Sequence, residues 1–204
     1  MLDDSLKEIK IILLGESGVG KTCLINVITG GVFDNDEVSS SSCSYREGSY
    51  ESQNGKKYIY HLWDTAGQEA YRSLNKIFIK NAKVVILVYS IENKESFKAL
   101  DFWINLVKTE IGENGYIMGI VGNKQDLYER QQVLEEEAIN YANKLGYKFK
   151  SVSALSDPLG FKRFLEELLV DYIKTVDSSC TDTFNNNSFS IQKKKHKKEK
   201  RRCC

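Results

Sequence analysis

Short apolar runs along the chain alternate with stretches in which apolar residues recur every three or four positions. Runs of the first kind are typical of buried strands, and recurrence of the second kind is typical of helices with one buried face. Together with two segments that flank Asn54-Gly55, the runs predict six strands, at residues 10–14, 45–52, 56–63, 83–89, 116–122 and 147–152. Because Asn-Gly is a strong hairpin signal, we expect the second and third strands to be antiparallel.

Helical segments are predicted between and after these strands. The first covers residues 23–28 and ends at Gly30-Gly31, and a second carries Phe97, Leu100, Ile104, Val107 and Ile111. A third covers residues 134–145 and is closed by Gly146. The final helix begins near Pro158 and has an apolar face of Phe161, Phe164, Leu165, Leu168, Leu169 and Tyr172. The order predicts an α/β fold with a roughly six-stranded, mostly parallel sheet that has one antiparallel strand and about five flanking helices. The serine-rich residues 31–44 show no periodicity and are predicted to form a loop.

Composition divides the chain into a body and a tail. A chain of 204 residues with 41% hydrophobic content suits one soluble domain. Residues 177–204 carry eight basic and three acidic residues, a net +5, so the total of +1 leaves −4 for residues 1–176. We therefore predict a domain over residues 1–176, a disordered polybasic tail over 177–204, and a body that does not bind nucleic acid.

Targeting signals and cysteines indicate the compartment. The longest apolar runs are far too short to cross a bilayer, and the acidic start of the chain does not resemble a secretory signal. The five scattered cysteines form neither a disulfide framework nor a zinc spacing. We expect a cytosolic protein with reduced thiols.

The segment Gly15-Glu16-Ser17-Gly18-Val19-Gly20-Lys21-Thr22 fits the phosphate-loop pattern Gly-x-x-x-x-Gly-Lys-Ser/Thr, and it lies between a predicted strand and a predicted helix. Its glycines allow successive backbone N–H groups to point at a polyphosphate, and the following helix presents its positive end to the same anion. Lys21 would add a positive charge for the outer phosphates. Thr22 would supply an oxygen ligand for Mg²⁺.

Asn123-Lys124-Gln125-Asp126 distinguishes a GTPase from the kinases and ATPases that share a phosphate loop. A carboxylate such as Asp126 can accept hydrogen bonds from both the ring N–H and the exocyclic amine of guanine. Adenine has an acceptor in place of that ring N–H, so it would leave the carboxylate unsatisfied. A P-loop kinase or ATPase remains an alternative, and equal competition by ATP would support it.

Four motifs in the same order make residues 1–176 resemble the Ras-like small GTPases, and hence the P-loop GTPase fold. They are the phosphate loop, Asp64-Thr65-Ala66-Gly67-Gln68-Glu69, Asn123-Lys124-Gln125-Asp126 and Ser153-Ala154-Leu155. Within that superfamily the chain looks most like the Rab branch, on the basis of Trp63, Tyr71-Arg72-Ser73-Leu74, residues 87–91 and the terminal Cys203-Cys204.

The resemblance implies a role for each matching position in binding GTP or GDP and Mg²⁺. Catalysis would involve Gln68, which orients the attacking water, and Lys21. Metal ligands would be Thr22, Ser40 and, through a water, Asp64. Nucleotide contacts would come from Gly15, Ser17, Gly18, Val19, Gly20, Lys21, Thr22, Cys23, Phe33, Ser40, Gly67, Asn123, Lys124, Asp126, Ser153, Ala154 and Leu155. Two alternatives stay open: Phe33 as a core residue and Gln68 as a solvated loop residue.

Three positions depart from the family pattern. Ser40 stands where the family has a threonine that binds Mg²⁺ and the γ-phosphate; it keeps the hydroxyl but lacks the stiffness of a β-branched side chain. We expect a first switch that orders less strongly on GTP, which leaves open a nucleotide-binding adaptor that scarcely hydrolyses GTP. Leu155 replaces the usual lysine near the base, and Ala70 replaces an arginine beside the second switch, where partners are recognised.

The resemblance also implies partners and a membrane location. An exchange factor, a GTPase-activating protein and effectors would bind residues 33–45 and 64–74. Because the chain has no obvious arginine finger, intrinsic hydrolysis should be slow, and a partner would accelerate it roughly 10³- to 10⁵-fold. Cys203 and Cys204 would be prenylated and anchor the protein to the cytoplasmic face of an internal membrane, where it would regulate vesicle traffic, with a monomer as the default state. The competing interpretation of Lys193–Arg202 is a nuclear-localisation or nucleic-acid-binding tail.

Overall fold

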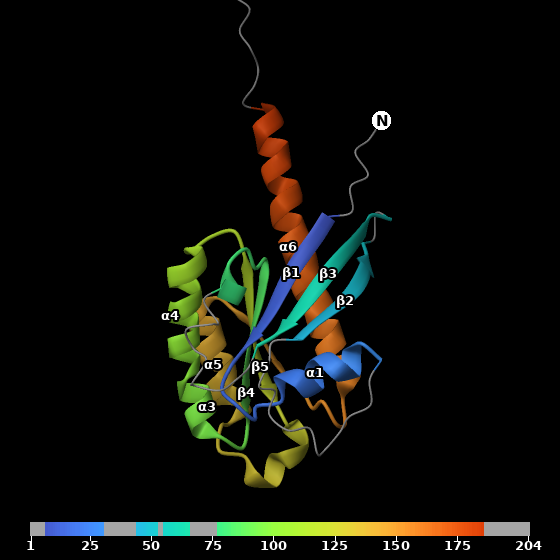
Figure 1. The fold of residues 1–204 in the computed structure, drawn as a ribbon. Coiled ribbons are helices and arrows are strands. Elements are labelled where there is room, and N and C mark those ends of the chain that lie inside the picture. The colour runs from blue at the N-terminus through green and yellow to red at the C-terminus, as the bar shows by residue number, and fades with distance from the viewer. Residues whose placement is uncertain (1–6, 31–43, 53–54, 66–76, 186–204) are drawn as a thin grey trace, which may run out of the picture.

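A six-stranded sheet runs through the middle of the protein (Figure 1). Its strands are β1 (Lys7–Leu14), β2 (Ser44–Glu51), β3 (Lys57–Asp64), β4 (Val84–Ser90), β5 (Ile117–Asn123) and β6 (Lys148–Ser151), in the order β2-β3-β1-β4-β5-β6. Strand β2 pairs antiparallel with β3, and every other pairing is parallel. The predicted mixed α/β sheet with one antiparallel strand is confirmed.

The computed structural model describes residues 7–30, 44–52, 55–65 and 77–185. Within these ranges no helix combines the length and apolar character that a membrane crossing requires.

Helices cover both faces of the sheet (Figure 1). On one face lie α1 (Lys21–Ile28) and α6 (Pro158–Asn185), and on the other lie α3 (Lys94–Lys98), α4 (Leu100–Ile111) and α5 (Glu135–Leu145). A 3₁₀ helix, η2 (Gln125–Arg130), follows β5. The described ranges thus hold five α-helices and one 3₁₀ helix, compared with about five flanking helices predicted from the sequence.

Burial on both faces explains the unbroken apolar runs of the central strands. In β4, Val84, Ile86 and Val88 pack with α1 and α6, whereas the intervening side chains Val85, Leu87 and Tyr89 pack with α3, α4 and α5. Because a parallel sheet of this kind has no solvent-facing side, alternation between apolar and polar residues disappears. The core is therefore two apolar layers separated by the sheet.

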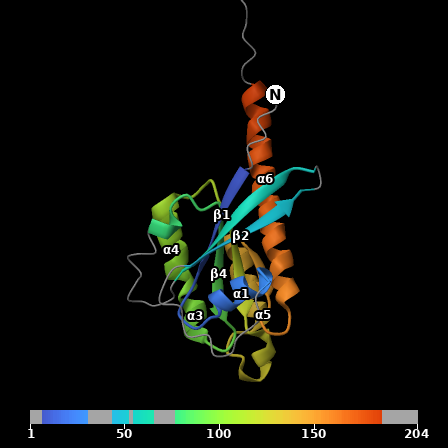
Figure 2. The same ribbon diagram turned by 45° about the vertical axis from the view of Figure 1, so that its right-hand side comes forward.

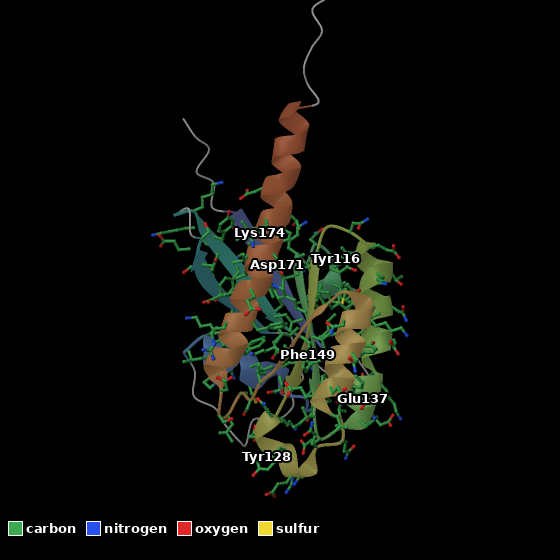
Figure 3. All side chains as sticks on the ribbon, turned by 180° about the vertical axis from the view of Figure 1, so that it is seen from behind. Tyr116, Tyr128, Glu137, Phe149, Asp171 and Lys174 are labelled. Carbon is green, nitrogen blue, oxygen red and sulfur yellow. The ribbon has the colours of Figure 1, made fainter. Side chains whose placement is uncertain are left out.

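Ion pairs join helices on each side of the sheet to their neighbours. Lys94 of α3 pairs with Glu137 of α5 at 2.9 Å, and Lys148 of β6 pairs with Asp171 of α6 at 2.6 Å. Glu137 and Asp171 are labelled in Figure 3 on these two helices. Both pairs are half-exposed, so each contributes about 1 kcal/mol or less to stability.

Two helices differ from their predicted bounds by more than one or two residues. The single helix expected across Phe97 to Ile111 is divided at Ala99, which ends α3 and precedes α4 although its φ of −67° and ψ of −12° stay in the right-handed helical region. The last helix continues to Asn185, although the sequence predicts disorder from Asp177 (Figure 2). No proline or glycine interrupts residues 177–185, so loss of apolar periodicity there does not end the helix. The domain boundary at residue 176 stays a prediction.

A glycine in β5 sets how closely α6 packs on the sheet. A Cβ atom at Gly119 would lie 2.8 Å from Leu168 Cδ1 and 2.9 Å from Phe164 Cζ, and both of these side chains are fully buried. We expect Gly119→Ala to lower the free energy of unfolding by about 1–3 kcal/mol through overpacking. Chemical denaturation measures the change.

The same substitution in a Leu168→Ala background provides the control. Since that background removes the nearest obstructing methyl, Gly119→Ala should cost at least about 0.5 kcal/mol less there than in the parent chain. An equal cost in both backgrounds would contradict the packing explanation.

Candidate functional site

The loops that follow β1, β4 and β5 surround a cavity of about 400 Å³ at the carboxyl edge of the sheet. Its lining comprises Ser17, Gly18, Val19, Ser90, Glu92, Asn93, Lys124 and Gln132. Ligand sites of α/β sheets lie at this edge. The volume falls in the range of sites for small organic ligands and cofactors.

The Gly15–Thr22 loop adopts a backbone that requires its glycines. Gly15, Gly18 and Gly20 have φ values of 151°, 74° and 91°. A Cβ at Gly15 would lie 2.1 Å from the Val88 carbonyl oxygen, and one at Gly20 would lie 2.4 Å from Asn123 Nδ2. At these two glycines the loop therefore lies closer to β4 and to the Asn123 side chain at the end of β5 than a residue with a side chain would allow.

Lys21 begins α1, and its ammonium folds back over the loop. Lys21 Nζ donates to the carbonyl oxygens of Gly15 and Glu16, each at 2.9 Å. Burial lowers the pKa of this ammonium to about 8, although the charges of Asp64 and Glu16 favour its protonated form. The amino group is therefore a desolvated cation beside the positive end of a helix, an arrangement that favours binding of an anion.

Two oxygen-bearing side chains meet beside this lysine. Thr22 Oγ1 donates to Asp64 Oδ2 at 2.6 Å, although 42 residues separate them. Asp64 is 1% exposed at the end of β3, and the next residue, Thr65, donates through its hydroxyl to the Leu13 carbonyl oxygen at 2.6 Å. A hydroxyl and a carboxylate are oxygen donors of the kind that Mg²⁺ prefers, so this pair fits a magnesium site next to a polyphosphate.

Asn123 connects the phosphate loop to the segment after β6. Its Nδ2 donates to the Val19 carbonyl oxygen at 2.8 Å, and its Oδ1 accepts from the Ala154 N–H at 3.2 Å. Asn123 is 1% exposed. Because both ends of this buried amide are bonded, its side chain fixes two loops relative to each other.

Asp126 and Lys124 are each held by a polar partner. Ser153 Oγ donates to Asp126 Oδ1 and accepts from the Leu155 N–H at 3.1 Å. Lys124 has a left-handed φ of 66°, and its Nζ lies 2.7 Å from Glu92 Oε1. The carboxylate and the lysine are thereby oriented by residues that lie far away in the sequence.

Comparison with known proteins identifies the family. Residues 10–174 match the family model described as "Ras family". The chain belongs to the Ras family. Members of this family in general bind guanine nucleotide and Mg²⁺, hydrolyse GTP, and work with exchange factors, activating proteins and effectors.

Similar proteins within the Ras family carry Rab names. The chain is 34% identical over 157 residues to Ras-related protein Rab-30 of Homo sapiens, covering 77% of this chain and 76% of that protein. It is 33% identical over 137 residues to Ras-related protein Rab-19 of Rattus norvegicus, covering 67% of this chain and 62% of that protein. The resemblance to Rab proteins predicted from the sequence is confirmed, and with it a GTPase switch of the Rab type.

The structure brings most of the predicted Ras-family site residues to one edge of the sheet. Ser17, Gly18, Val19 and Lys124 line the cavity, while hydrogen bonds and close approaches join Gly15, Gly20, Lys21, Thr22, Asp64, Asn123, Asp126, Ser153 and Ala154. Cys23 is half-buried in α1, and the Leu155 side chain is 53% exposed. Phe33, Ser40, Gly67, Gln68, Ala70, Cys203 and Cys204 lie outside the described residues.

Several residues of the site were not predicted from the sequence. Ser90, Glu92, Asn93 and Gln132 line the cavity, and the buried hydroxyl of Ser90 has no hydrogen-bond partner within the described ranges. The position of Ser90 at the carboxyl end of a buried strand was the available signal. Trp103 of α4 was also missed: its Nε1 donates to Glu16 Oε1 at 3.1 Å and so fixes the phosphate loop from a helix 87 residues away.

The low pKa of Lys21 predicts proton uptake when nucleotide binds. Phosphate oxygens favour the charged lysine, so its pKa should rise on binding. At pH 9 the Lys21 amino group is largely neutral without nucleotide, so binding should take up close to one proton. At pH 7 the group is already mostly protonated, so binding should take up little. Calorimetry of GDP binding in two buffers of different ionisation enthalpy measures the uptake.

Lys21→Arg is the control, because arginine stays charged at both pH values. Its uptake should be the same at pH 7 and pH 9. If the parent chain showed no increase in uptake at pH 9, the buried-lysine interpretation would be wrong.

Asn123→Ala should weaken the connection between the two loops even without nucleotide. Removing a buried amide that is bonded at both ends leaves the Val19 carbonyl and the Ala154 N–H unsatisfied, at a cost of about 1–3 kcal/mol in the free energy of unfolding. Denaturation of the nucleotide-free protein measures this cost. Asn105→Ala, on the exposed face of α4, should change stability by less than about 0.5 kcal/mol; similar losses for both variants would contradict the prediction.

Proposed function

We propose that this Ras-family protein is a Rab-type switch that binds and hydrolyses GTP and is anchored to an internal membrane, where it regulates vesicle traffic. The supporting observation is the arrangement at the carboxyl edge of the sheet. A glycine loop and the start of α1 lie on one side of the cavity, and Asn123 ties that loop to the segment that carries Asp126. One ligand with an anionic end and a hydrogen-bonding base would satisfy both sides.

At the phosphate end, loop N–H groups and the positive end of α1 would hold the β- and γ-phosphates. Lys21 would exchange its two loop carbonyls for phosphate oxygens. Thr22 and Ser40 would coordinate Mg²⁺, and Asp64 would act through a water. When bound, the ion neutralises charge that develops on the phosphates.

At the base end, Asp126 would accept the ring N–H and exocyclic amine of guanine. The bond from Ser153 to one carboxylate oxygen orients the group for this contact. Asn123, Lys124 and the Ala154 N–H would complete the pocket, and the Phe33 ring would pack against the base. Since an adenine ring would leave the carboxylate unsatisfied, the site should strongly prefer guanine.

Hydrolysis would use water as the nucleophile, with Gln68 orienting it and the Gly67 N–H contacting the γ-phosphate. The γ-phosphate would order residues 33–45 and 64–74, and its loss would release them. Regulators and effectors would therefore recognise these two segments in the GTP form.

Anchoring is proposed from the end of the sequence. Prenyl chains on Cys203 and Cys204 would each contribute about 0.8 kcal/mol per buried CH₂, and each nearby basic residue about 1 kcal/mol toward anionic lipid. The lipid chains would hold the protein on the membrane, while the basic residues would favour anionic surfaces.

Single-turnover hydrolysis of bound GTP tests the switch. The full chain should hydrolyse GTP slowly, and Gln68→Leu should abolish hydrolysis while leaving GTP affinity within about twofold, because it removes only the group that orients the water. Absence of hydrolysis in both proteins, despite tight GTP binding, would support the adaptor alternative.

Replacing both terminal cysteines tests the anchor. The double variant Cys203→Ser/Cys204→Ser, expressed in cells, should move from the membrane fraction to the soluble fraction, since no lipid can then be attached. Cys180→Ser, which keeps the terminal pair, should stay on membranes. Continued membrane attachment of the double variant would refute the lipid anchor. Accumulation of both the parent chain and the double variant in the nucleus would refute it as well.

A further inference from the structure

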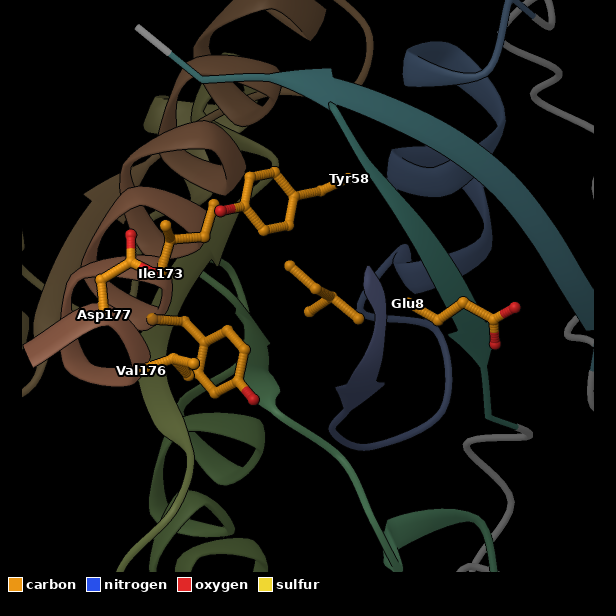
Figure 4. Close-up of a pocket in the computed structure, with 7 residues that line it drawn as sticks. Glu8, Tyr58, Ile173, Val176 and Asp177 are labelled. Carbon is orange, nitrogen blue, oxygen red and sulfur yellow. The ribbon is translucent and has the colours of Figure 1, made fainter. Parts of the chain in front are cut away.

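A second cavity, of about 270 Å³, lies at the opposite edge of the sheet from the nucleotide site (Figure 4). It opens between the beginnings of β1 and β3 and the middle of α6, and is lined by Glu8, Ile9, Tyr58, Tyr172, Ile173, Val176 and Asp177. Strand β1 separates it from the phosphate loop by about 20 Å, at about 3.3 Å per residue. The cavity therefore shares no lining residue with the proposed nucleotide site.

The hydroxyl of Tyr58 is the unusual feature of this cavity. Tyr58 is 3% exposed, and its hydroxyl oxygen has no hydrogen-bond partner within the described part of the chain. Figure 4 shows its ring extending from β3 toward Ile173 of α6. A buried phenol without a partner is costly, so a ligand that bonds to it would be favoured.

A carboxylate lies near this hydroxyl. Burial raises the pKa of the Tyr58 phenol, and the negative charge of Asp177 raises it further. Asp177 is half-buried at the cavity and forms no ion pair within residues that the structure describes. Glu8 also lines the cavity, but in Figure 4 its carboxylate points away from the labelled residues of α6.

The remaining walls are hydrocarbon and aromatic. Ile9 and Ile173 are 1% and 8% exposed, and Val176 and Tyr172 line the α6 side. An anionic ligand would be repelled by Asp177, and a purely apolar ligand would leave the Tyr58 hydroxyl unsatisfied. A straight alkyl chain that ends in a cation satisfies both the walls and the polar groups.

We propose that this cavity binds a primary alkyl ammonium group carried on a straight hydrocarbon chain. One ammonium N–H donates to the Tyr58 oxygen, another pairs with the Asp177 carboxylate, and the methylenes pack on Ile9 and Ile173. The volume equals that of about nine waters at roughly 30 Å³ each, enough for a chain of five or six carbons. Aliphatic diamines and lysine side chains share this chemistry.

Titration calorimetry of the full chain with 1,5-diaminopentane at pH 7 tests the proposal. We expect saturable binding, with affinity at least tenfold weaker for pentane-1,5-diol, which has the same length but no charge. Shifts of the Tyr58 ring signals, assigned by their loss in Tyr58→Phe, should accompany binding. Absence of saturable binding, or equal affinity for the diol, would overturn the proposal.

Four variants locate the site. Asp177→Asn and Tyr58→Phe should each weaken diamine binding, by about tenfold and about fivefold, because one removes the charge and the other the hydroxyl. Glu167→Gln, an exposed acidic position on the same helix, and Tyr128→Phe, a tyrosine that is 68% exposed, should bind like the parent chain. Equal weakening by these controls, or no weakening by the first two, would refute the site.

Two further measurements are needed. One shows whether weakened binding is due to misfolding, and the other shows where the ammonium group comes from. Tyr58→Phe should keep or raise the unfolding temperature, because it removes a buried hydroxyl that has no partner; a weakened affinity then cannot be due to misfolding. A full chain with Lys193→Gln, Lys194→Gln and Lys195→Gln distinguishes the sources. Tighter diamine binding by this variant would assign the site to lysines of the chain's own tail, and unchanged binding would assign it to an external ammonium.

Discussion

The amide of Asn123 joins parts of the protein that the sequence places far apart. It bonds to Val19 in the phosphate loop, 104 residues earlier, and to Ala154, 31 residues later. The glycine at position 20 leaves just enough room for this amide, since a Cβ there would lie 2.4 Å from it. The buried side chain of Asn123 therefore holds the proposed phosphate and base sites together, and it can do so because Gly20 has no side chain.

The charge of Lys21 explains why such a rigid frame is needed. Its ammonium is buried, and its pKa falls to about 8, so the nucleotide-free protein holds a partly desolvated cation beside a helix start. Two loop carbonyls offset part of that cost. Trp103 and Asn123 fix the loop from two different elements, so the loop would not have to be organised when a phosphate replaces those carbonyls.

The two edges of the sheet have different chemistry. At the carboxyl edge, backbone N–H groups, lysines and paired oxygens suit an anionic ligand. At the opposite edge, tyrosines, aliphatic side chains and Asp177 form a smaller cavity that suits a cation. Helix α6 packs on the sheet near both of them: it begins just after the Ser153–Ser156 segment and lines the second cavity with Ile173 and Val176.

The sequence by itself determined the strands, the sheet class and the motifs, because buried parallel strands and a glycine-dependent phosphate loop leave local patterns in the residues. Most predicted site residues that the structure describes lie together for the same reason: each motif follows a strand, and parallel strands end at one edge. Only the tertiary structure decided which residues from separate loops meet. The Glu92–Lys124 pair, the Trp103–Glu16 bond and the cavity beside Tyr58 depend on strand order and helix packing, which no local pattern encodes. The extension of α6 over residues 177–185 was also missed, since the sequence of that part has no apolar periodicity.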